Sequence, residues 1–407
     1  MKMGEHIQLQ RVIGYFHGTI FLFSIIIGAG IFIAPKGVLK YSLLNVGVSL
    51  SIWTACALVS VVAALSHAEL GTTFPRSGAQ YYFLKRSFGP FIAFFYLWIH
   101  LFSTPAGIAA RVLLLAGYIT QPFYPGCFVP EVPKKCLALA ILLCLGILNA
   151  RGVKEVTWFQ TVSTVVKITV LCFISLTGIV LLVRGKKENL ARFEKAFDAE
   201  VPDASQIAEA FLQGLYSYSG WGVLVRIAGE LKNPGENIPK CVITALTLVA
   251  LIYLLVNISY LAVLTPKEIM SSDLITLINY VGFTDWILLG LMMTGLIKLR
   301  FQEPNLSRPY KVHLPFVFGT LAMSLFLVLT PIIKSPKMHH IYVIVFVLSG
   351  LLFYFPFVHF NLGSTYFNKI TCFLQLLLNV SPADDVEYIS PEGVLQKIPP
   401  ETATKKE

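Results

Sequence analysis

A short glycine run is the first stretch of the sequence whose residue types could bind a small molecule. Ile27-Gly28-Ala29-Gly30-Ile31-Phe32 lies inside an apolar segment, 13–36, that is long enough to cross a membrane. Two glycines two positions apart weaken the hydrogen-bond ladder of a helix and leave backbone groups free. In a membrane, such groups are tolerated where they line a cavity or bind a ligand. The glycines could equally let two helices pack closely, so this run alone leaves both interpretations open.

A second apolar segment, 207–228, repeats the pattern and is the sixth of the chain. Small, hydroxyl and aromatic residues crowd its middle, in the order Gly214-Leu215-Tyr216-Ser217-Tyr218-Ser219-Gly220-Trp221-Gly222. A helix break here would pair with the first one across a pseudo-two-fold axis, with a binding site between them. Two interrupted segments therefore favour broken helices over close packing.

Three basic residues, Arg111, Lys167 and Arg226, lie within apolar segments, where a charge is costly and indicates function by default. Arg111 is in the second half of its segment, so its side chain either faces a cavity or extends to the membrane surface. Thr104 lies seven positions earlier, on the same helix face. The ammonium of Lys167 either occupies the place of a sodium ion between two helices or forms an ion pair that holds them together.

Composition assigns the chain to the polytopic membrane proteins. Its 407 residues are 56% hydrophobic and only 13% charged, with a mean hydropathy of +0.71, whereas a soluble domain carries about 25% charged residues. The net charge of +10 is explained by basic residues near the membrane surfaces and does not indicate binding of nucleic acid. No cluster of Cys and His residues has the spacing of metal ligands, and no segment combines a catalytic nucleophile with a general base. We therefore expect no metal, no other cofactor and no enzyme activity.

Ten apolar segments are long enough to be considered as spans: 13–36, 44–70, 91–118, 136–150, 156–183, 207–228, 240–264, 274–297, 314–333 and 341–358. An even number puts both termini on one side of the membrane. With the N-terminus inside, 17 basic residues fall on the inner side and 12 on the outer side, which favours cytoplasmic termini. We expect a membrane domain over 13–358 and cytoplasmic tails at 1–12 and 359–407. The second tail includes a possible amphipathic helix at 365–380.

The connections between segments carry three further features. Glu69 lies at the end of the second segment, where its carboxylate can reach the membrane interface. The polar and aromatic stretch that follows, 76–82, suits an interfacial helix. The loop 119–135 contains Cys127 and Cys136, and Cys127 could pair with Cys136, stay free or bond a partner chain.

Together these motifs resemble the light subunits of heteromeric amino-acid transporters, in the amino acid–polyamine–organocation superfamily. The similarity extends over nearly the whole chain and is carried by the following residues: Ile27 to Phe32, Ala68 to Gly71, Arg76 to Gly78, Cys127, Lys167, Tyr218, Gly220-Trp221, Glu230, Asn233-Pro234, Ile238-Pro239, Leu299 to Pro304 and Arg308 to Val312. Within that family, the chain is most similar to the member that carries aspartate, glutamate and cystine.

The resemblance implies an all-α fold of the LeuT type, with two inverted five-helix repeats and broken first and sixth helices. In similar proteins the first break binds the substrate carboxylate through backbone N–H groups, here those of Gly28, Ala29, Gly30 and Ile31. The sixth helix offers backbone carbonyls to the α-amino group, here around Tyr216, Ser217 and Tyr218. Tyr216 is also at the position of an aromatic gate.

Other matches imply how such a protein works and with which partner. Lys167 matches a lysine that, in sodium-independent members, lies near a sodium position of their relatives. Cys127 matches the cysteine that bonds a single-span glycoprotein heavy chain. The resemblance therefore implies a sodium-independent exchanger of anionic amino acids and cystine that works by alternating access in the plasma membrane.

Three residues in the sixth segment depart from the family pattern. Ser219 replaces a common glycine and Gly222 a common Asn or Asp, and both changes reshape the side-chain pocket. Arg226 replaces an apolar residue. Together with Arg111 it would give the cavity two cations, which favour an acidic substrate side chain.

The largest departure is a gap in the order of spans. Family members have twelve, but here 265–273 leads from the seventh span directly into a segment that resembles the tenth. The eighth and ninth spans are missing. Because alternating access needs one helix bundle to move against another, an alternative function remains open. In that alternative, the chain is a non-transporting form that binds a heavy chain and competes with a full-length light subunit.

Overall fold

The computed structural model describes residues 11, 13–74, 79–124, 130–151, 153–185, 193, 196–265, 269, 275–334, 338–359, 388–389 and 395–396. The chain divides into two units, 1–350 and 351–407. Cys127, the segment 365–380 and all of the tail 1–12 except residue 11 lie outside the described residues.

Helices occupy all ten of the apolar segments. In chain order the elements are α1 (Tyr15–Ile26), α2 (Gly30–Tyr41), α3 (Val46–Thr73), α4 (Ala79–Phe88), α5 (Pro90–Thr120), η1 (Gln121–Phe123), α6 (Glu131–Arg151), α7 (Val153–Val183), α9 (Ala204–Ser217), α10 (Val223–Arg226), η2 (Ala228–Glu230), α11 (Pro234–Val263), α13 (Ile275–Gln302), α14 (Leu314–Lys334), α15 (Met338–Phe353) and η3 (Tyr354–His359). In the second unit, β1 (Tyr388–Ile389) and β2 (Leu395–Gln396) form a short antiparallel pair.

Length and composition qualify most of these helices as membrane spans. In the described part of the chain, six helices are long and apolar enough to cross a membrane, and the bent pair α1 and α2 makes a seventh. The sixth segment is divided into α9 and α10. The fold is therefore that of an all-α polytopic membrane protein, as the sequence predicts. Residues 79–82 of the expected interfacial helix lie in a separate short helix, α4, and 76–78 lie outside the described residues.

Local sequence signals explain where the helices begin. The side chain of Asn45 caps α3 by accepting a hydrogen bond from the amide of Val48 at 3.0 Å. Asp203 and Gln206 form a capping box at the start of α9. Pro90 and Pro234 occupy the first positions of α5 and α11, where a helix tolerates a residue without an N–H group.

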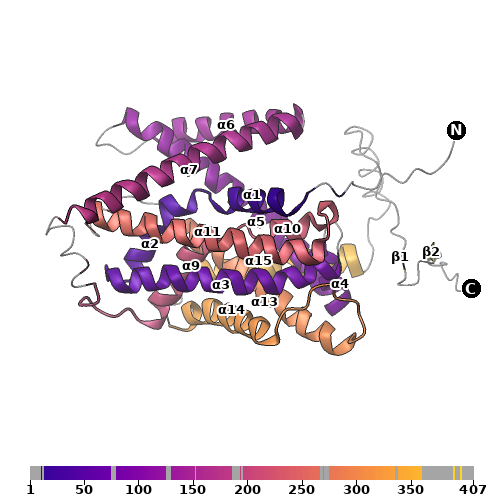
Figure 1. Ribbon diagram of the computed structural model, residues 1–407. Helices are drawn as coiled ribbons and strands as arrows, with labels where there is room; N and C mark the ends of the chain where they lie inside the picture. Colours follow the sequence, from indigo (N-terminus) through magenta and orange to yellow (C-terminus); the bar gives the residue numbers. More distant parts are fainter. Residues whose placement is uncertain are drawn as a thin grey trace, which may run out of the picture. The chain divides into compact units, whose positions relative to one another are not determined.

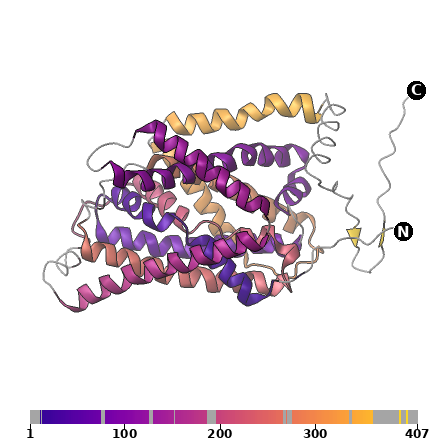
Figure 2. The same cartoon turned by 90° about the horizontal axis from the view of Figure 1, so that it is seen from above.

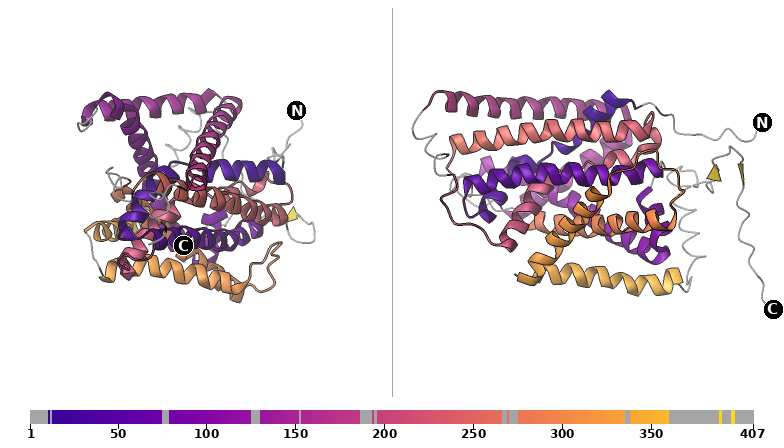
Figure 3. Two further views of the ribbon diagram at one scale, coloured as in Figure 1. Left: turned by 60° about the vertical axis from the view of Figure 1, so that its left-hand side comes forward. Right: turned by 60° about the horizontal axis from the view of Figure 1, so that its bottom comes forward.

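Most long helices of the first unit run back and forth along one common direction (Figures 1 and 2). At its centre α3 packs against α11, α11 also packs against α1 and α7, and α2 packs against α9. Figure 3 shows α6 bridging α5 and α7 at one side of this unit. Three buried rings, Trp53, Tyr218 and Tyr253, meet in the core with centroids 5.1–6.0 Å apart.

The end of α3 corrects one expectation from the sequence. Glu69 does not extend to the protein surface, because its side chain is fully buried. It accepts two hydrogen bonds from Arg300 and one from the amide of Val312 at 2.9 Å. Arg308 adds a second cation, with Nε 3.6 Å from the carboxylate. The three side chains Glu69, Arg300 and Arg308 are called the closed charge cluster below.

A second, more accessible ion pair lies near this cluster in the chain. Arg86 of α4 donates two hydrogen bonds to Glu303, which follows the end of α13. The carboxylate of Glu303 raises the pKa of the Arg86 guanidinium, chiefly through this hydrogen bond. The two pairs fasten α3 and α4 to the end of α13 and the loop after it.

Candidate functional site

The first span is broken between α1 and α2, which meet at an angle of 51°. The carbonyl groups at the end of α1 are bound by side chains from two other helices. The ammonium of Lys167, on α7, donates to the carbonyls of Ser24 at 3.0 Å and Ile27 at 2.7 Å. The hydroxyl of Tyr253, on α11, lies 3.1 Å from the carbonyl of Ile26. The end of α1 is thus satisfied without the helix continuing.

The amide groups after the break, in contrast to these carbonyls, are not hydrogen-bonded to any described residue. The N–H groups of Gly28, Ala29, Gly30 and Ile31 find no hydrogen-bond acceptor within the described part of the chain. They precede or begin α2, so the positive end of its dipole adds to their attraction for an anion. A carboxylate is the natural partner for such a group of donors.

The two glycines of the run have different structural roles. A Cβ atom on Gly30 would lie 2.6 Å from Cα of Ser217, so that α2 and α9 could not approach as closely as they do. A Cβ atom on Gly28 would have no neighbour nearer than 4.0 Å, because this residue faces open space. The sequence left packing and ligand binding as alternatives, and the structure assigns close packing to Gly30 and open space to Gly28.

The sixth span is broken between α9 and α10. Gly220 has φ of +105° there, a conformation that other residues rarely adopt. The carbonyl of Ser217 also lies 3.1 Å from the hydroxyl of Tyr253, and that of Tyr216 accepts from the amide of Ser219 at 3.2 Å. The carbonyls of Tyr218 and Ser219 accept no hydrogen bond from any described residue. An ammonium group could take these free acceptors.

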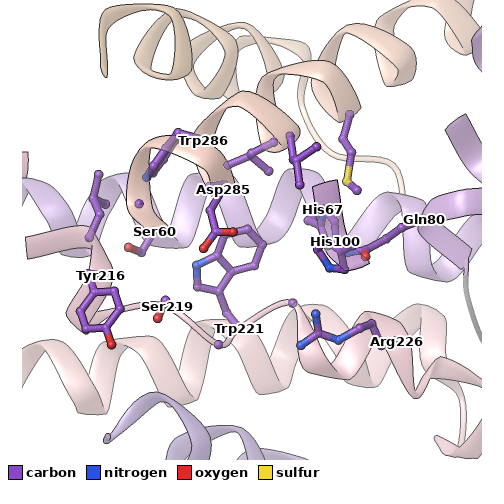
Figure 4. A pocket seen from close by; sticks show the side chains of 18 of the residues that line it. Ser60, His67, Gln80, His100, Tyr216, Ser219, Trp221, Arg226, Asp285 and Trp286 are labelled. Atoms are coloured by element: carbon purple, nitrogen blue, oxygen red, sulfur yellow. The ribbon is translucent and has the colours of Figure 1, made fainter. Parts of the chain in front are cut away.

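A cavity of about 450 Å³ lies between the two breaks. Its wall includes the backbone of both breaks and the side chains of Tyr216, Arg111, Arg226 and Asp285. No hydrogen bond or ion pair within 4.0 Å joins these three charged side chains to another described residue. They are exposed to the cavity, and Figure 4 shows Asp285 extending from its helix toward the space between Tyr216 and Arg226. Arg111, Arg226 and Asp285 are called the open charge cluster below.

Comparison with known proteins assigns this architecture to a family. The profile described as "Amino acid permease" matches residues 13–284. The chain belongs to the amino acid permease family. It is 47% identical to mouse solute carrier family 7 member 13, over 94% of this chain and 98% of that protein. It is 45% identical to mouse solute carrier family 7 member 12, over 93% and 99%. It is 31% identical to the human b(0,+)-type amino acid transporter 1, over 93% and 94%.

The alignment with member 13 also bears on the missing spans. It extends over 466 positions, 59 more than the 407 residues of this permease. The mouse protein therefore has residues without a counterpart here. Since a span needs about 20 residues, a difference of this size is large enough to hold two.

The structure brings most of the predicted site residues of this permease to one cavity. Those that line it are Gly28, Ala29, Gly30, Tyr216, Ser217, Ser219, Arg111 and Arg226. The side chains of Ile31 and Tyr218 are fully buried in the core instead, so that only their backbone groups remain for a ligand. Lys167 lies at the carbonyl side of the first break, where its partners among the described residues are backbone oxygens and no carboxylate.

The open charge cluster contains one residue that the sequence analysis missed. Asp285 is the only carboxylate in the segment 274–297, and an acidic residue in an apolar span is a signal of function. The family motifs did not include it, so its position beside Arg111 and Arg226 emerged only from the structure. Cys136 is an exposed free thiol near the start of α6.

Proposed function

We propose that this permease carries anionic amino acids, aspartate and glutamate, and also cystine, as a sodium-independent exchanger. The α-carboxylate binds the free amides at Gly28 to Ile31, and the ammonium binds the free carbonyls of Tyr218 and Ser219. Tyr216 lines the cavity beside these groups and acts as the gate. The substrate side chain then points toward Arg111 and Arg226.

The observation that carries this proposal is that the guanidinium groups of Arg111 and Arg226 are unpaired among the described residues. Both guanidinium groups line the cavity, and neither has a hydrogen bond or ion pair within the described residues. A guanidinium group that lacks a partner can form a bidentate, charge-assisted pair with a carboxylate. A substrate with a second carboxylate supplies that pairing, whereas a neutral side chain leaves both cations unpaired. With Asp285 included, the cluster carries one net positive charge, which matches one extra negative charge on the substrate.

The test compares acidic with neutral substrates. Purified protein in liposomes is assayed for uptake of labelled aspartate, glutamate, cystine and leucine, with wild type beside Arg111→Ala and Arg226→Ala. Each variant should lose aspartate and glutamate uptake at least tenfold, the effect of one charge-assisted hydrogen bond, and keep any neutral uptake. Equal losses for all substrates would contradict the assignment of these residues to selectivity.

Sodium independence rests on Lys167. Its ammonium binds two carbonyls at the end of α1, and such carbonyls are the ligands that a sodium ion would otherwise use. Uptake should therefore be the same in sodium and choline buffers. A rate that rises with sodium would rule out this role for Lys167.

We also propose a partner and a location. Cys127 forms an interchain disulfide with a single-span glycoprotein heavy chain, in the plasma membrane and with cytoplasmic N- and C-termini. Coexpression with a heavy chain should give a higher band on a non-reducing gel, which Cys127→Ser removes and Cys136→Ser, the matched control, retains. A band that survives Cys127→Ser would assign the bond to another cysteine.

The length of the alignment with member 13 favours a second candidate function. A chain that lacks two spans could bind the substrate and the heavy chain without transporting, and so compete with a full-length light subunit. Binding of aspartate without uptake, in the presence of a heavy chain, would select this alternative. Uptake that is stimulated by the heavy chain would select the exchanger.

A further inference from the structure

A second chamber adjoins the substrate cavity. It has a volume of about 190 Å³ and shares six residues with the larger cavity: His100, Tyr216, Ser219, Gly220, Arg226 and Asp285. Figure 4 shows its lining side chains, with Asp285 on one wall and Arg226 on the facing one. We call it the distal chamber, because it lies beyond the shared residues from the free amides of the first break.

The distal chamber presents one positive and one negative side chain that are not paired with one another. Arg226 and Asp285 form no ion pair within 4.0 Å, although the two charges are close enough to interact through space. Two opposite charges facing the same chamber complement a ligand that carries a carboxylate and an ammonium together. An α-amino-acid head is such a group.

The wall of the chamber also contains polar side chains from α3, α4 and α5, among them His67, Gln80 and His100. The hydroxyl of Tyr96 donates to Oε1 of Gln80, so the amide nitrogen of Gln80 faces Nε2 of His67 at 2.7 Å. Nε2 therefore accepts, and the neutral ring of His67 carries its proton on Nδ1. Nδ1 of His67, a residue only 2% exposed, has no partner among the described residues, and the same is true of Nδ1 of His100.

We propose that the distal chamber binds the second α-amino-acid head of a substrate that has two such heads, as cystine does. Arg226 binds the distal carboxylate and Asp285 binds the distal ammonium. The proposal rests on the function proposed above, in which the first head occupies the two helix breaks. The two Cα atoms of a disulfide-linked pair are about 5.5–6 Å apart, so the second head of a bound cystine reaches an adjoining chamber and no farther.

This arrangement explains why a carboxylate lies in a cavity for anionic substrates. For aspartate or glutamate, Asp285 opposes the side-chain carboxylate and weakens its binding. For a two-headed substrate, Asp285 has an ammonium to bind. The same side chain therefore shifts preference away from one-headed dicarboxylates and toward two-headed substrates.

Two synthetic ligands isolate the contribution of the distal ammonium. L,L-2,7-diaminosuberate has the shape of cystine with methylene groups in place of sulfur, and L-2-aminosuberate lacks only the distal ammonium. Their affinities for the purified full-length protein, with that of glutamate, are measured by titration calorimetry. Wild type should prefer the diamino ligand about tenfold or more, the effect of one charge-assisted hydrogen bond.

Asp285→Asn should move the affinities in opposite directions. The diamino ligand should lose its preference entirely, while glutamate and 2-aminosuberate should bind more tightly. Asp285→Glu, which retains the charge, should keep the preference, and the melting temperature of each variant reports whether it is folded. An unchanged preference in Asp285→Asn would overturn the proposal. If wild type binds glutamate but does not prefer the diamino ligand, the proposal for the distal chamber is overturned and the proposed function is not. If wild type binds none of the ligands, both are overturned.

Discussion

The two charge clusters of this protein contain the same kinds of residue in opposite conditions. In the closed cluster, the carboxylate of Glu69 is fully buried and is bonded to Arg300 and to a backbone amide. In the open cluster, Asp285 and its two arginines face a cavity and form no ion pair with a described residue. Each cluster has one carboxylate and two guanidinium groups, so the clusters do not differ in composition. They differ in whether these charged side chains form ion pairs with one another.

The difference teaches which charges hold the helices together and which await a ligand. A buried charge whose hydrogen bonds are all made stabilises the packing of the segments that supply it, and its loss leaves its partners unpaired. Charges that remain unpaired in a cavity contribute little to the fold and much to recognition.

The largest effect is expected in the closed cluster. Glu69→Ala removes the acceptor of Arg300 and leaves two buried cations near one another, so the free energy of unfolding should fall by about 3–5 kcal/mol. Thermal unfolding in detergent measures this. The matched control is Glu303→Ala, which breaks the more exposed pair with Arg86 and should cost about 1 kcal/mol or less. Equal losses would mean that burial does not distinguish the two pairs.

The next effect concerns the two glycines of the first break. Gly30→Ala forces α2 away from α9, because its Cβ atom would meet the backbone of Ser217, and overpacking of this kind costs about 1–3 kcal/mol. Gly28→Ala has room for its methyl group, so its melting temperature should stay within a few degrees of wild type while affinity for the substrate carboxylate falls. If the two variants had the same stability, packing would not explain Gly30.

A smaller effect is expected in the open cluster. Arg226→Ala removes a charge that has no partner in the described structure, so stability should stay the same or rise by up to about 1 kcal/mol, as functional residues often allow. The same thermal assay measures it. A loss as large as that of Glu69→Ala would show that Arg226 is a structural residue.

The smallest effect sets the baseline. Glu236 and Lys240 form an exposed ion pair one turn apart on α11, at 3.0 Å. Glu236→Gln should change the free energy of unfolding by no more than about 0.5 kcal/mol. A larger change would mean that the thermal assay reports surface charges too strongly to separate the two clusters.

The sequence predicted the helices well, because hydropathy is a property of each segment by itself. All ten apolar segments contain helices, and both breaks fall at the glycine-containing runs. The sequence also directed attention to Arg111 and Lys167, since any charge in an apolar span is costly.

Pairing between distant residues was beyond the reach of the sequence. Glu69 and Arg300 are 231 positions apart, and no local pattern states that one neutralises the other, so Glu69 was assigned to the interface. The resemblance assigned only the backbone carbonyl of Tyr218 to the site, and the packing of its ring on Trp53 and Tyr253 could not be predicted from the sequence. Asp285 could have been found by the rule that identified Arg111, applied to acidic residues as well.

Tyr253 connects the two breaks in a way that limits how they can move. Its hydroxyl lies 3.1 Å from the carbonyl of Ile26 and 3.1 Å from that of Ser217. A hydroxyl has one proton to donate, so the two helix ends compete for it. The ring is held between Trp53 and Tyr218, and a shift of either end transfers the hydrogen bond to the other. The single hydroxyl proton can therefore hold only one of the two breaks at a time, and the carbonyl of the other break is then released.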